Sequence, residues 1–201
     1  MAEDKAGGDA TMLDATILAY LKRDHLLREG HFVYRSGRHS AVRLDRDRLL
    51  ADPGVASRMG YALAKHFFTS KVTTIAAPSI WGAGLAQWVA YFLDPRAKVV
   101  YATPRGGQVT IAENLAGLIH GERVVLIDNL VISGETLARF DTEVAQLGGE
   151  VIGIGTLWNS GDSIIAEHEV IGLLNGAYPA YLPAECPLCR DGGSPPEQVS
   201  Y

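Results

Sequence analysis

From residue 72 onward the chain alternates apolar runs with glycine-containing loops, and this alternation constrains the fold more than any other feature. Apolar runs typical of strands occupy residues 72–77, 98–102, 124–127, 151–158 and 170–174. Helical spacing fits residues 85–93 and 134–147, which lie between runs. Strands that are apolar on both faces and alternate with helices indicate a parallel sheet covered on both sides. The sequence therefore predicts an α/β protein with a Rossmann-like parallel sheet.

The first quarter of the chain predicts a smaller, different unit. We expect a disordered leader over residues 1–10, a helix over residues 11–28 that Gly30 ends, and two short strands within residues 31–48. A helix over residues 53–68 begins at Asp52-Pro53.

The remaining segments lack a periodic pattern. We expect loops over residues 78–84 and 103–120, and an irregular region over residues 175–201 whose last part, 191–201, is a flexible tail.

Charge and cysteine content narrow the class of protein. The chain has 18 Lys and Arg against 23 Asp and Glu, a net charge of −5, so binding to nucleic acid or to an anionic membrane is not expected. Two cysteines cannot form a disulfide framework, which favours a reducing, cytoplasmic location. No apolar run is long enough to span a membrane. With 47% hydrophobic residues, the chain can bury the core of one domain over residues 11–190.

The segment Val124–Leu137, VVLIDNLVISGETL, carries the strongest chemical signal. An apolar strand ends at Asp128, and Ser133-Gly134 precedes a helix. The first N–H groups of a helix attract phosphate, glycine allows close approach of the backbone, and the Ser133 and Thr136 hydroxyls add donors. Asp128 can accept hydrogen bonds from sugar hydroxyls. A plain strand–helix turn with Ser133 as the N-cap is the alternative interpretation.

This segment resembles the phosphoribosyl pyrophosphate (PRPP) motif of the type I phosphoribosyltransferases. Further motifs resemble one branch, the orotate phosphoribosyltransferases: Gly30–Val33 with Ser36–Ser40, Ala77–Gly82, and Glu185–Cys189 with its Cys-Pro-x-Cys pattern. The motifs occur in the family's order over about residues 13–190.

The resemblance implies the type I phosphoribosyltransferase fold, with a small hood formed mainly by residues 11–48 and part of 159–190. It implies transfer of phosphoribosyl from PRPP to a pyrimidine-like base with release of pyrophosphate, in nucleotide biosynthesis or salvage. Mg²⁺ bound through PRPP and a homodimer are implied as well.

The resemblance also assigns site residues. Catalysis would involve Asp128 and Arg105, and no metal ligand from the protein is predicted. The base would contact Ser36, Gly37, Arg38 and Asn159. Residues implied to bind PRPP lie in the loops after two strands: Pro78, Ser79, Trp81 and Gly82, and Asp128, Asn129, Ile132, Ser133, Gly134, Glu135 and Thr136.

Four departures from the family pattern fall on functional positions. Asn129 replaces the second acid, Gln108 stands where the mobile loop carries a lysine, Trp81 replaces a small residue, and Asn159 lies where an arginine holds the base. Two hypotheses follow. The chain is an active transferase with altered contacts, or it is a catalytically degenerate homologue that acts as a nucleotide-binding or phosphate-binding regulator or a dimeric scaffold.

Two further clusters receive bland interpretations. Five arginines lie in residues 35–48, and Arg46 and Arg48 would point together on one strand face. One interpretation is an anion-binding edge that reaches the PRPP of a dimer partner, and the other, which we favour, is the solvated face of an edge strand. Cys186 and Cys189 are interpreted as structural or incidental, because a zinc site needs four ligands and no second cysteine pair exists. His31 and His39 are the histidines near the proposed site, and neither has a paired acid.

Overall fold

The computed structural model describes residues 16–105, 108–176, 178–192 and 194–200. Its main sheet has seven strands in the order β5-β4-β3-β6-β7-β9-β8. The five central strands are parallel, and β5 and β8 pair antiparallel at the two edges. The strands are β3 (Thr74–Ala77), β4 (Lys98–Arg105), β5 (Gln108–Ile111), β6 (Arg123–Val131), β7 (Glu150–Asn159), β8 (Ile164–Ile165) and β9 (His168–Asn175). The predicted parallel sheet is confirmed.

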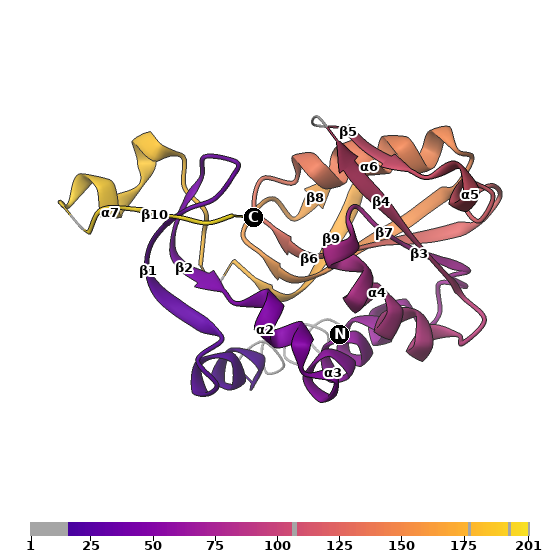
Figure 1. The fold of residues 1–201 in the computed structure, drawn as a ribbon, viewed down its shortest axis with the longest axis horizontal. Coiled ribbons are helices and arrows are strands. Elements are labelled where there is room, and N and C mark those ends of the chain that lie inside the picture. Colours follow the sequence, from indigo (N-terminus) through magenta and orange to yellow (C-terminus); the bar gives the residue numbers. More distant parts are fainter. Residues whose placement is uncertain (1–15, 106–107, 177, 193, 201) are drawn as a thin grey trace, which may run out of the picture.

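Helices cover both faces of this sheet (Figure 1). One core cluster joins α3 (Pro53–Ala64) and α4 (Ile80–Leu93) to one face, where Leu63 and Leu85 pack with Ile127. A second cluster joins α6 (Glu135–Gln146) to the other face through Phe140. The short elements η1 (Lys65–Phe67) and α5 (Glu113–Ala116) complete this part of the fold. No helix in the described ranges has the length and apolar character needed to cross a membrane.

The strand order has a switch point between β3 and β6, which are parallel neighbours in the sheet. After β3 the chain passes through α4 to β4 on one side, and after β6 it passes through α6 to β7 on the other. In open α/β sheets, ligands bind outside the carboxyl ends of the strands at such a switch point. The topology therefore places the segments after β3 and β6 side by side.

A second, three-stranded sheet lies beside the main one, in the order β10-β1-β2 (Figure 1). It consists of the hairpin β1 (Leu27–Val33) and β2 (His39–Leu44), to which β10 (Glu197–Gln198) adds in parallel. The C-terminal segment crosses this hairpin through η2 (Pro183–Glu185) and α7 (Pro187–Arg190). We call this sheet and residues 178–200 the hood.

The hood differs from the expectation at its C-terminal end. Residues 197–199 belong to the predicted flexible tail, yet β10 pairs with β1 and the Val199 N–H donates to the Val33 carbonyl at 2.8 Å. The Val199 side chain is buried against Phe32 and Tyr34. Because an unpaired edge of β1 offers free backbone groups, the last residues of the chain gain a ladder there. The predicted leader, residues 1–10, lies outside the described residues.

Several predicted element boundaries were wrong. The first helix ends at residue 23 and Gly30 lies inside β1. Residues 46–51 form the helix α2 (Arg46–Ala51) instead of a strand, because the Asp45 side chain accepts the Arg48 N–H and caps it. The predicted excursion 103–120 contains the rest of β4, β5 and α5. The strand β6 continues to Val131 because β7 pairs with it as far as Asn159.

Candidate functional site

Two helix N-termini meet at the switch point of the sheet. α4 follows β3 with Ser79 as its N-cap, and α6 follows β6 with Gly134 as its N-cap. Among the described residues, no side chain hydrogen-bonds as a cap to either helix. Their first N–H groups and the positive ends of both helix dipoles therefore favour an anion at this edge. The N-cap of α6 is Gly134, so the prediction of Ser133 as the N-cap is wrong. The interpretation of this segment as a plain strand–helix turn is not tested by the position of the cap.

Asp128 lies near the end of β6, opposite Thr156 of β7, and its carboxylate lies beside Gly82 in the first turn of α4. Its side chain is partly buried, and Oδ1 accepts the backbone N–H of Asn129 at 2.8 Å. Burial raises the pKa of Asp128 to about 6, while that hydrogen bond and the charge of Arg46 oppose the rise. The carboxyl group can therefore accept from sugar hydroxyls, and a bound cation would favour its ionised form.

Gly82 allows α4 to start directly against the end of β6. A Cβ at this position would lie 3.0 Å from the Ile127 carbonyl oxygen and 3.4 Å from Oδ1 of Asp128. Trp81 occupies the first turn of α4 with 58% of its surface exposed. The predicted loop 78–84 thus contains helix from Ile80, and the large indole points outward instead of filling the turn.

Arg46 lies at the site, although the interpretation favoured from the sequence was the solvated face of a strand. Its guanidinium lies 5.7 Å from the centroid of the Trp81 ring, and its charge acts on Asp128. The helix α2 brings it there, so it does not share a strand face with Arg48 as expected. A cation beside Asp128 and two helix N-termini adds to the attraction for a polyanion.

Asn129 ties the end of β6 to the first turn of α4. Its side chain is fully buried and Nδ2 donates to the Trp81 carbonyl oxygen at 2.9 Å. Its Oδ1 is buried with no hydrogen-bond partner within the described part of the chain. Asn129, which the resemblance places among the PRPP-binding residues, thus uses its side-chain NH2 group for a hydrogen bond within the protein.

The conformation of the loop after β6 depends on Gly134, and Ile132 anchors the loop to the hood. Gly134 has φ of 77°, in the left-handed region, and a Cβ there would lie 2.8 Å from Cδ1 of Ile165. Ile132 is partly buried and packs against the hood core of Phe32, Tyr34 and Val199. The exposed first turn of α6 holds Glu135 and Thr136. The predicted phosphate-binding residues therefore surround one helix N-terminus.

The carboxyl end of β7 supports this loop from behind. The Ser160 N–H donates to the Val131 carbonyl at 2.8 Å. Asn159, predicted to contact the base, donates from Nδ2 to the Asp162 carbonyl at 3.0 Å, and its Oδ1 accepts the Gly161 N–H at 3.0 Å. Its polar atoms close a local turn, so the structure gives Asn159 a supporting position.

The remaining predicted residues lie at the periphery. Ser36 and Gly37 are exposed in the turn of the hood hairpin, where Arg38 donates from Nη1 to the Ala180 carbonyl at 3.1 Å. Pro78 is buried directly before α4. Arg105 ends β4 and pairs with Gln108 of β5, and its side chain lies outside the described part of the structure. Base contact by the hairpin turn and catalysis by Arg105 stay predictions.

The structure contradicts the expectation that the two cysteines lack metal-binding partners. His31, His39, Cys186 and Cys189 bring their ligand atoms within 4.8 Å of one another. The sequence analysis considered His31 and His39 only as histidines near the proposed active site, not as metal ligands. Two features of the sequence could have indicated this cluster. They are the Cys-x-x-Cys spacing and the two histidines on the paired strands of one hairpin, His31 on β1 and His39 on β2.

Known proteins resemble this chain in sequence and in fold. An orotate phosphoribosyltransferase of Thermus thermophilus is 34% identical over 177 residues, which cover 88% of this chain and 96% of that protein. No protein-family model matches the chain.

Solved structures share the fold at lower identity. A crystal structure of Mycobacterium tuberculosis H37Rv orotate phosphoribosyltransferase superposes with a TM-score of 0.57 at 18% identity, covering 81% of this chain and 96% of that one. The same enzyme in complex with PRPP gives a TM-score of 0.52 at 16% identity over 66% of this chain and 80% of that one. These likenesses confirm the expected fold class.

Proposed function

The chain belongs to the orotate phosphoribosyltransferase family, and from this membership we propose that it transfers phosphoribosyl from PRPP to orotate with release of pyrophosphate. Family membership and the PRPP complex of the M. tuberculosis relative support the donor substrate. Orotate as the base rests on the relatives' name, and the implied role is pyrimidine nucleotide biosynthesis.

The proposal rests on one arrangement at the edge of the sheet. The N-termini of α4 and α6, neither of which has a side-chain cap, lie at the same edge as the partly buried carboxylate of Asp128. PRPP has a phosphate at one end, a diphosphate at the other and ribose hydroxyls between them. The N-terminus of α6 suits the 5′-phosphate, the N-terminus of α4 with Arg46 suits the diphosphate, and Asp128 suits the hydroxyls. Three binding functions of one substrate thus fit one edge of the sheet.

The chemistry of these residues fits Mg²⁺ that arrives with PRPP. Mg²⁺ is commonly held by one or two carboxylates together with substrate phosphates and water. Asp128 supplies one carboxylate, and the buried Asn129 amide supplies no second charge. When bound, the cation would neutralise the leaving diphosphate. The protein's own part is to position the ribose and the base and to stabilise the diphosphate electrostatically.

The departures at Trp81 and Asn129 do not block this arrangement. The Trp81 side chain is exposed in the first turn of α4. Nδ2 of Asn129 donates a hydrogen bond to the Trp81 carbonyl oxygen. No observation in the described residues favours the degenerate alternative, and the comparisons support an enzyme. We also propose that the protein is a homodimer, as the family resemblance implies.

Calorimetry with PRPP and Mg²⁺, followed by an assay of orotate consumption and pyrophosphate release, tests the function. We expect PRPP binding and turnover in the wild type, and loss of both in Asp128→Ala. Gly134→Ala should also weaken PRPP binding, because its Cβ meets Ile165 at the α6 N-terminus.

Gly121→Ala is the matched control for the glycine variant. Gly121 has φ of 75°, close to the 77° of Gly134, but a Cβ there meets nothing within 4 Å. Both variants therefore carry a similar backbone cost of about 1 kcal/mol, and Gly134→Ala alone disturbs the site. A folded wild type that binds PRPP without turnover would favour the degenerate homologue, and absence of PRPP binding would refute the proposed site.

A further inference from the structure

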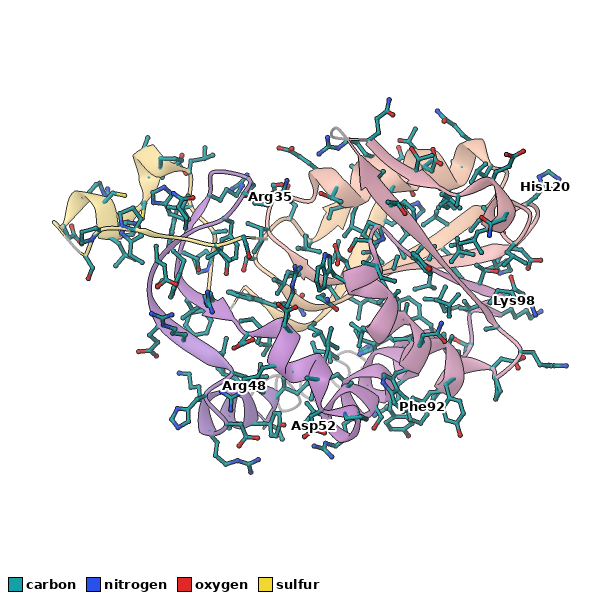
Figure 2. The ribbon with its side chains drawn as sticks, in the orientation of Figure 1. Arg35, Arg48, Asp52, Phe92, Lys98 and His120 are labelled. Atoms are coloured by element: carbon teal, nitrogen blue, oxygen red, sulfur yellow. The ribbon has the colours of Figure 1, made fainter. Side chains whose placement is uncertain are left out.

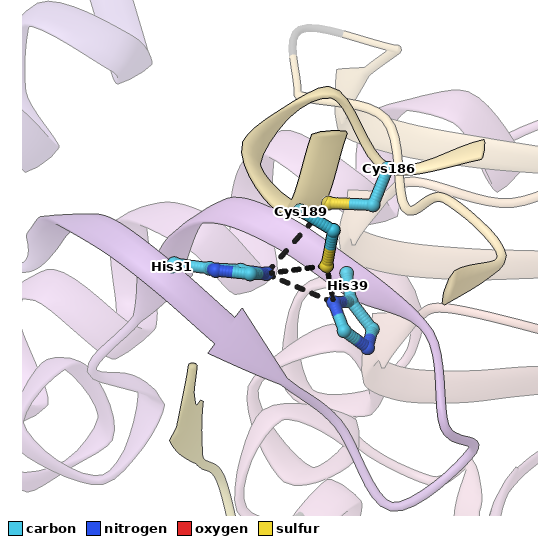
Figure 3. Close-up of side chains that lie close together, drawn as sticks. All are labelled: His31, His39, Cys186 and Cys189. Atoms are coloured by element: carbon cyan, nitrogen blue, oxygen red, sulfur yellow. Dashed lines mark hydrogen bonds between the residues drawn. The ribbon is translucent and has the colours of Figure 1, made fainter. Parts of the chain in front are cut away.

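Four side chains from two distant parts of the chain converge on one point in the hood (Figure 3). His31 lies on β1, His39 begins β2, and Cys186 and Cys189 lie at the start of α7 and within it. His31, His39 and Cys186 are buried, with exposed fractions of 6%, 8% and 0%. Cys189 is exposed and closes the cluster on its solvent side.

We propose that His31, His39, Cys186 and Cys189 bind one structural Zn²⁺ ion that fastens the C-terminal segment to the hood hairpin. Two imidazoles and two thiols form a ligand set typical of structural zinc sites, and Cys-Pro-Leu-Cys has the Cys-x-x-Cys spacing of such sites. The four ligands would fill a tetrahedral shell, so no position remains for a substrate.

The distances between the ligand atoms fit this shell. Nε2 of His31 lies 2.9 Å from Nδ1 of His39, 3.7 Å from Sγ of Cys186 and 3.6 Å from Sγ of Cys189. Sγ of Cys189 lies 3.3 Å from Nδ1 of His39. Ligands of tetrahedral zinc, with Zn–N of about 2.0–2.1 Å and Zn–S of about 2.3 Å, are separated by about 3.3–3.8 Å. Of these four separations, only the one between the two ring nitrogens is too short, and it must widen by a few tenths of an ångström. All the ligand atoms lie within 4.8 Å of one another.

A hydrogen bond outside the cluster orients the His31 ring for this role. Nδ1 of His31 lies 2.9 Å from the Ser194 carbonyl oxygen, which can only accept, so Nδ1 carries the proton. The lone pair then resides on Nε2 and points into the cluster. Metal-binding histidines commonly donate their other N–H to a carbonyl or carboxylate in this manner, which fixes the tautomer.

Charge and ligand softness favour Zn²⁺ over other cations. Two thiolates balance the charge of one divalent ion, and their two protons leave to solvent on binding, so the buried site becomes neutral overall. Thiolate with imidazole in a tetrahedral arrangement suits zinc, whereas Mg²⁺ and Ca²⁺ require oxygen ligands.

The hood gains most from such a fastening because its own core is small. Its separate hydrophobic cluster consists of Phe32, Tyr34 and Val199, with Ile132 packed against it. Several polar links also join the hairpin to the C-terminal segment. They include the short β10–β1 pairing, the backbone contacts between His39 and Tyr181, and the exposed Arg28–Glu197 ion pair. Units with so little apolar core usually need a metal or disulfide.

Metal analysis of the purified full chain, carrying no histidine tag, tests the proposal. We expect about one zinc per chain after dialysis against metal-free buffer, and loss of this zinc in Cys189→Ser. After exchange to Co²⁺, the visible spectrum should show a tetrahedral ion with a thiolate charge-transfer band that weakens in the same variant. His120→Ala is the matched control, since His120 lies on the far side of the main sheet from the hood (Figure 2) and should keep its zinc.

If Cys189→Ser fails to fold, the wild-type protein still tests whether the cluster binds zinc. A thiol reagent should label both cysteines only after a strong chelator has removed the metal, and removal should lower the Tm. A wild type that neither contains nor takes up stoichiometric Zn²⁺ would overturn the proposal, and so would a Cys186–Cys189 disulfide or equal zinc in variant and wild type. None of these readouts depends on transferase activity.

Discussion

At the scale of single residues, Asp128 combines a binding role with a cost to stability. The ordinary pKa of an aspartate is 3.8, and burial raises that of Asp128 to about 6. The native state therefore holds a proton that the unfolded chain releases between about pH 4 and pH 6. Across this window the free energy of unfolding falls as pH rises, by up to about 3 kcal/mol from this group.

Asp128→Asn should remove this pH-dependent loss. The amide does not titrate, and its oxygen can still accept the Asn129 N–H. Urea unfolding of wild type and variant should give similar stabilities near about pH 4 and a more stable variant near about pH 8, because other titrating groups cancel in the difference. A difference that does not change with pH would show that the pKa of Asp128 is not raised.

At the scale of elements, the hydrogen bond from Asn129 to Trp81 joins β6 to α4. Gly82 in the same turn permits the close approach, and the Asn129 amide satisfies a carbonyl at the start of the helix. Asn129 stands where the family has its second acid, and its amide donates to a carbonyl in the first turn of α4. A buried donor is needed where a carboxylate would face a carbonyl oxygen.

Asn129→Asp, which restores the family's acidic pair, should therefore destabilise the protein instead of improving it. An ionised aspartate would be buried against the Trp81 carbonyl beside Asp128, at a cost of about 1–3 kcal/mol. Protonation restores a donor, so the loss in the free energy of unfolding should shrink as pH falls. Thermal unfolding at several pH values measures this, with Asn129→Ser as a smaller, uncharged comparison. An unchanged Tm at alkaline pH would contradict the assigned hydrogen bond.

At the scale of the whole molecule, exposed aromatic side chains on α3, on α4 and directly after η1 suggest where a second copy packs. Tyr61, Phe68 and Tyr91 are 47%, 51% and 60% exposed, and Tyr61 and Tyr91 each pack edge-on against Phe92. Contiguous apolar surface of this kind on a soluble protein commonly marks an interface. The exposed side of α3 and α4 therefore fits a contact with a second copy of the chain.

The double variant Tyr61→Glu/Tyr91→Glu should therefore dissociate the proposed homodimer into folded monomers. Buried charges without partners disfavour association strongly. Size-exclusion chromatography with light scattering measures the mass, and Ile164→Glu, which changes a residue 63% exposed at the β8 edge, should stay dimeric. A double variant that remains a dimer would place the interface elsewhere.

Local patterns in the sequence were sufficient to predict the elements that carry the site. The apolar run before Asp128 and the helical spacing after Gly134 gave β6 and α6, because a buried strand and an amphipathic helix each leave a periodic pattern. Their boundaries were less predictable. β6 continues past Asp128 because β7 offers a partner, and α4 starts at Ile80 because Gly82 can lie against β6. These are contacts between segments, which no local pattern encodes.

The fold class and the family could be inferred from the amino-acid sequence, because periodic patterns and short motifs are properties of local segments. The three-dimensional arrangement was needed to show that Arg46 lies over Trp81, that Asn129 donates to the first turn of α4, and that residues 197–199 complete the hood. It also brought His31 and His39 to Cys186 and Cys189, more than 140 residues further along the chain. Such meetings depend on strand order and crossover direction, and these are fixed by packing of the whole chain.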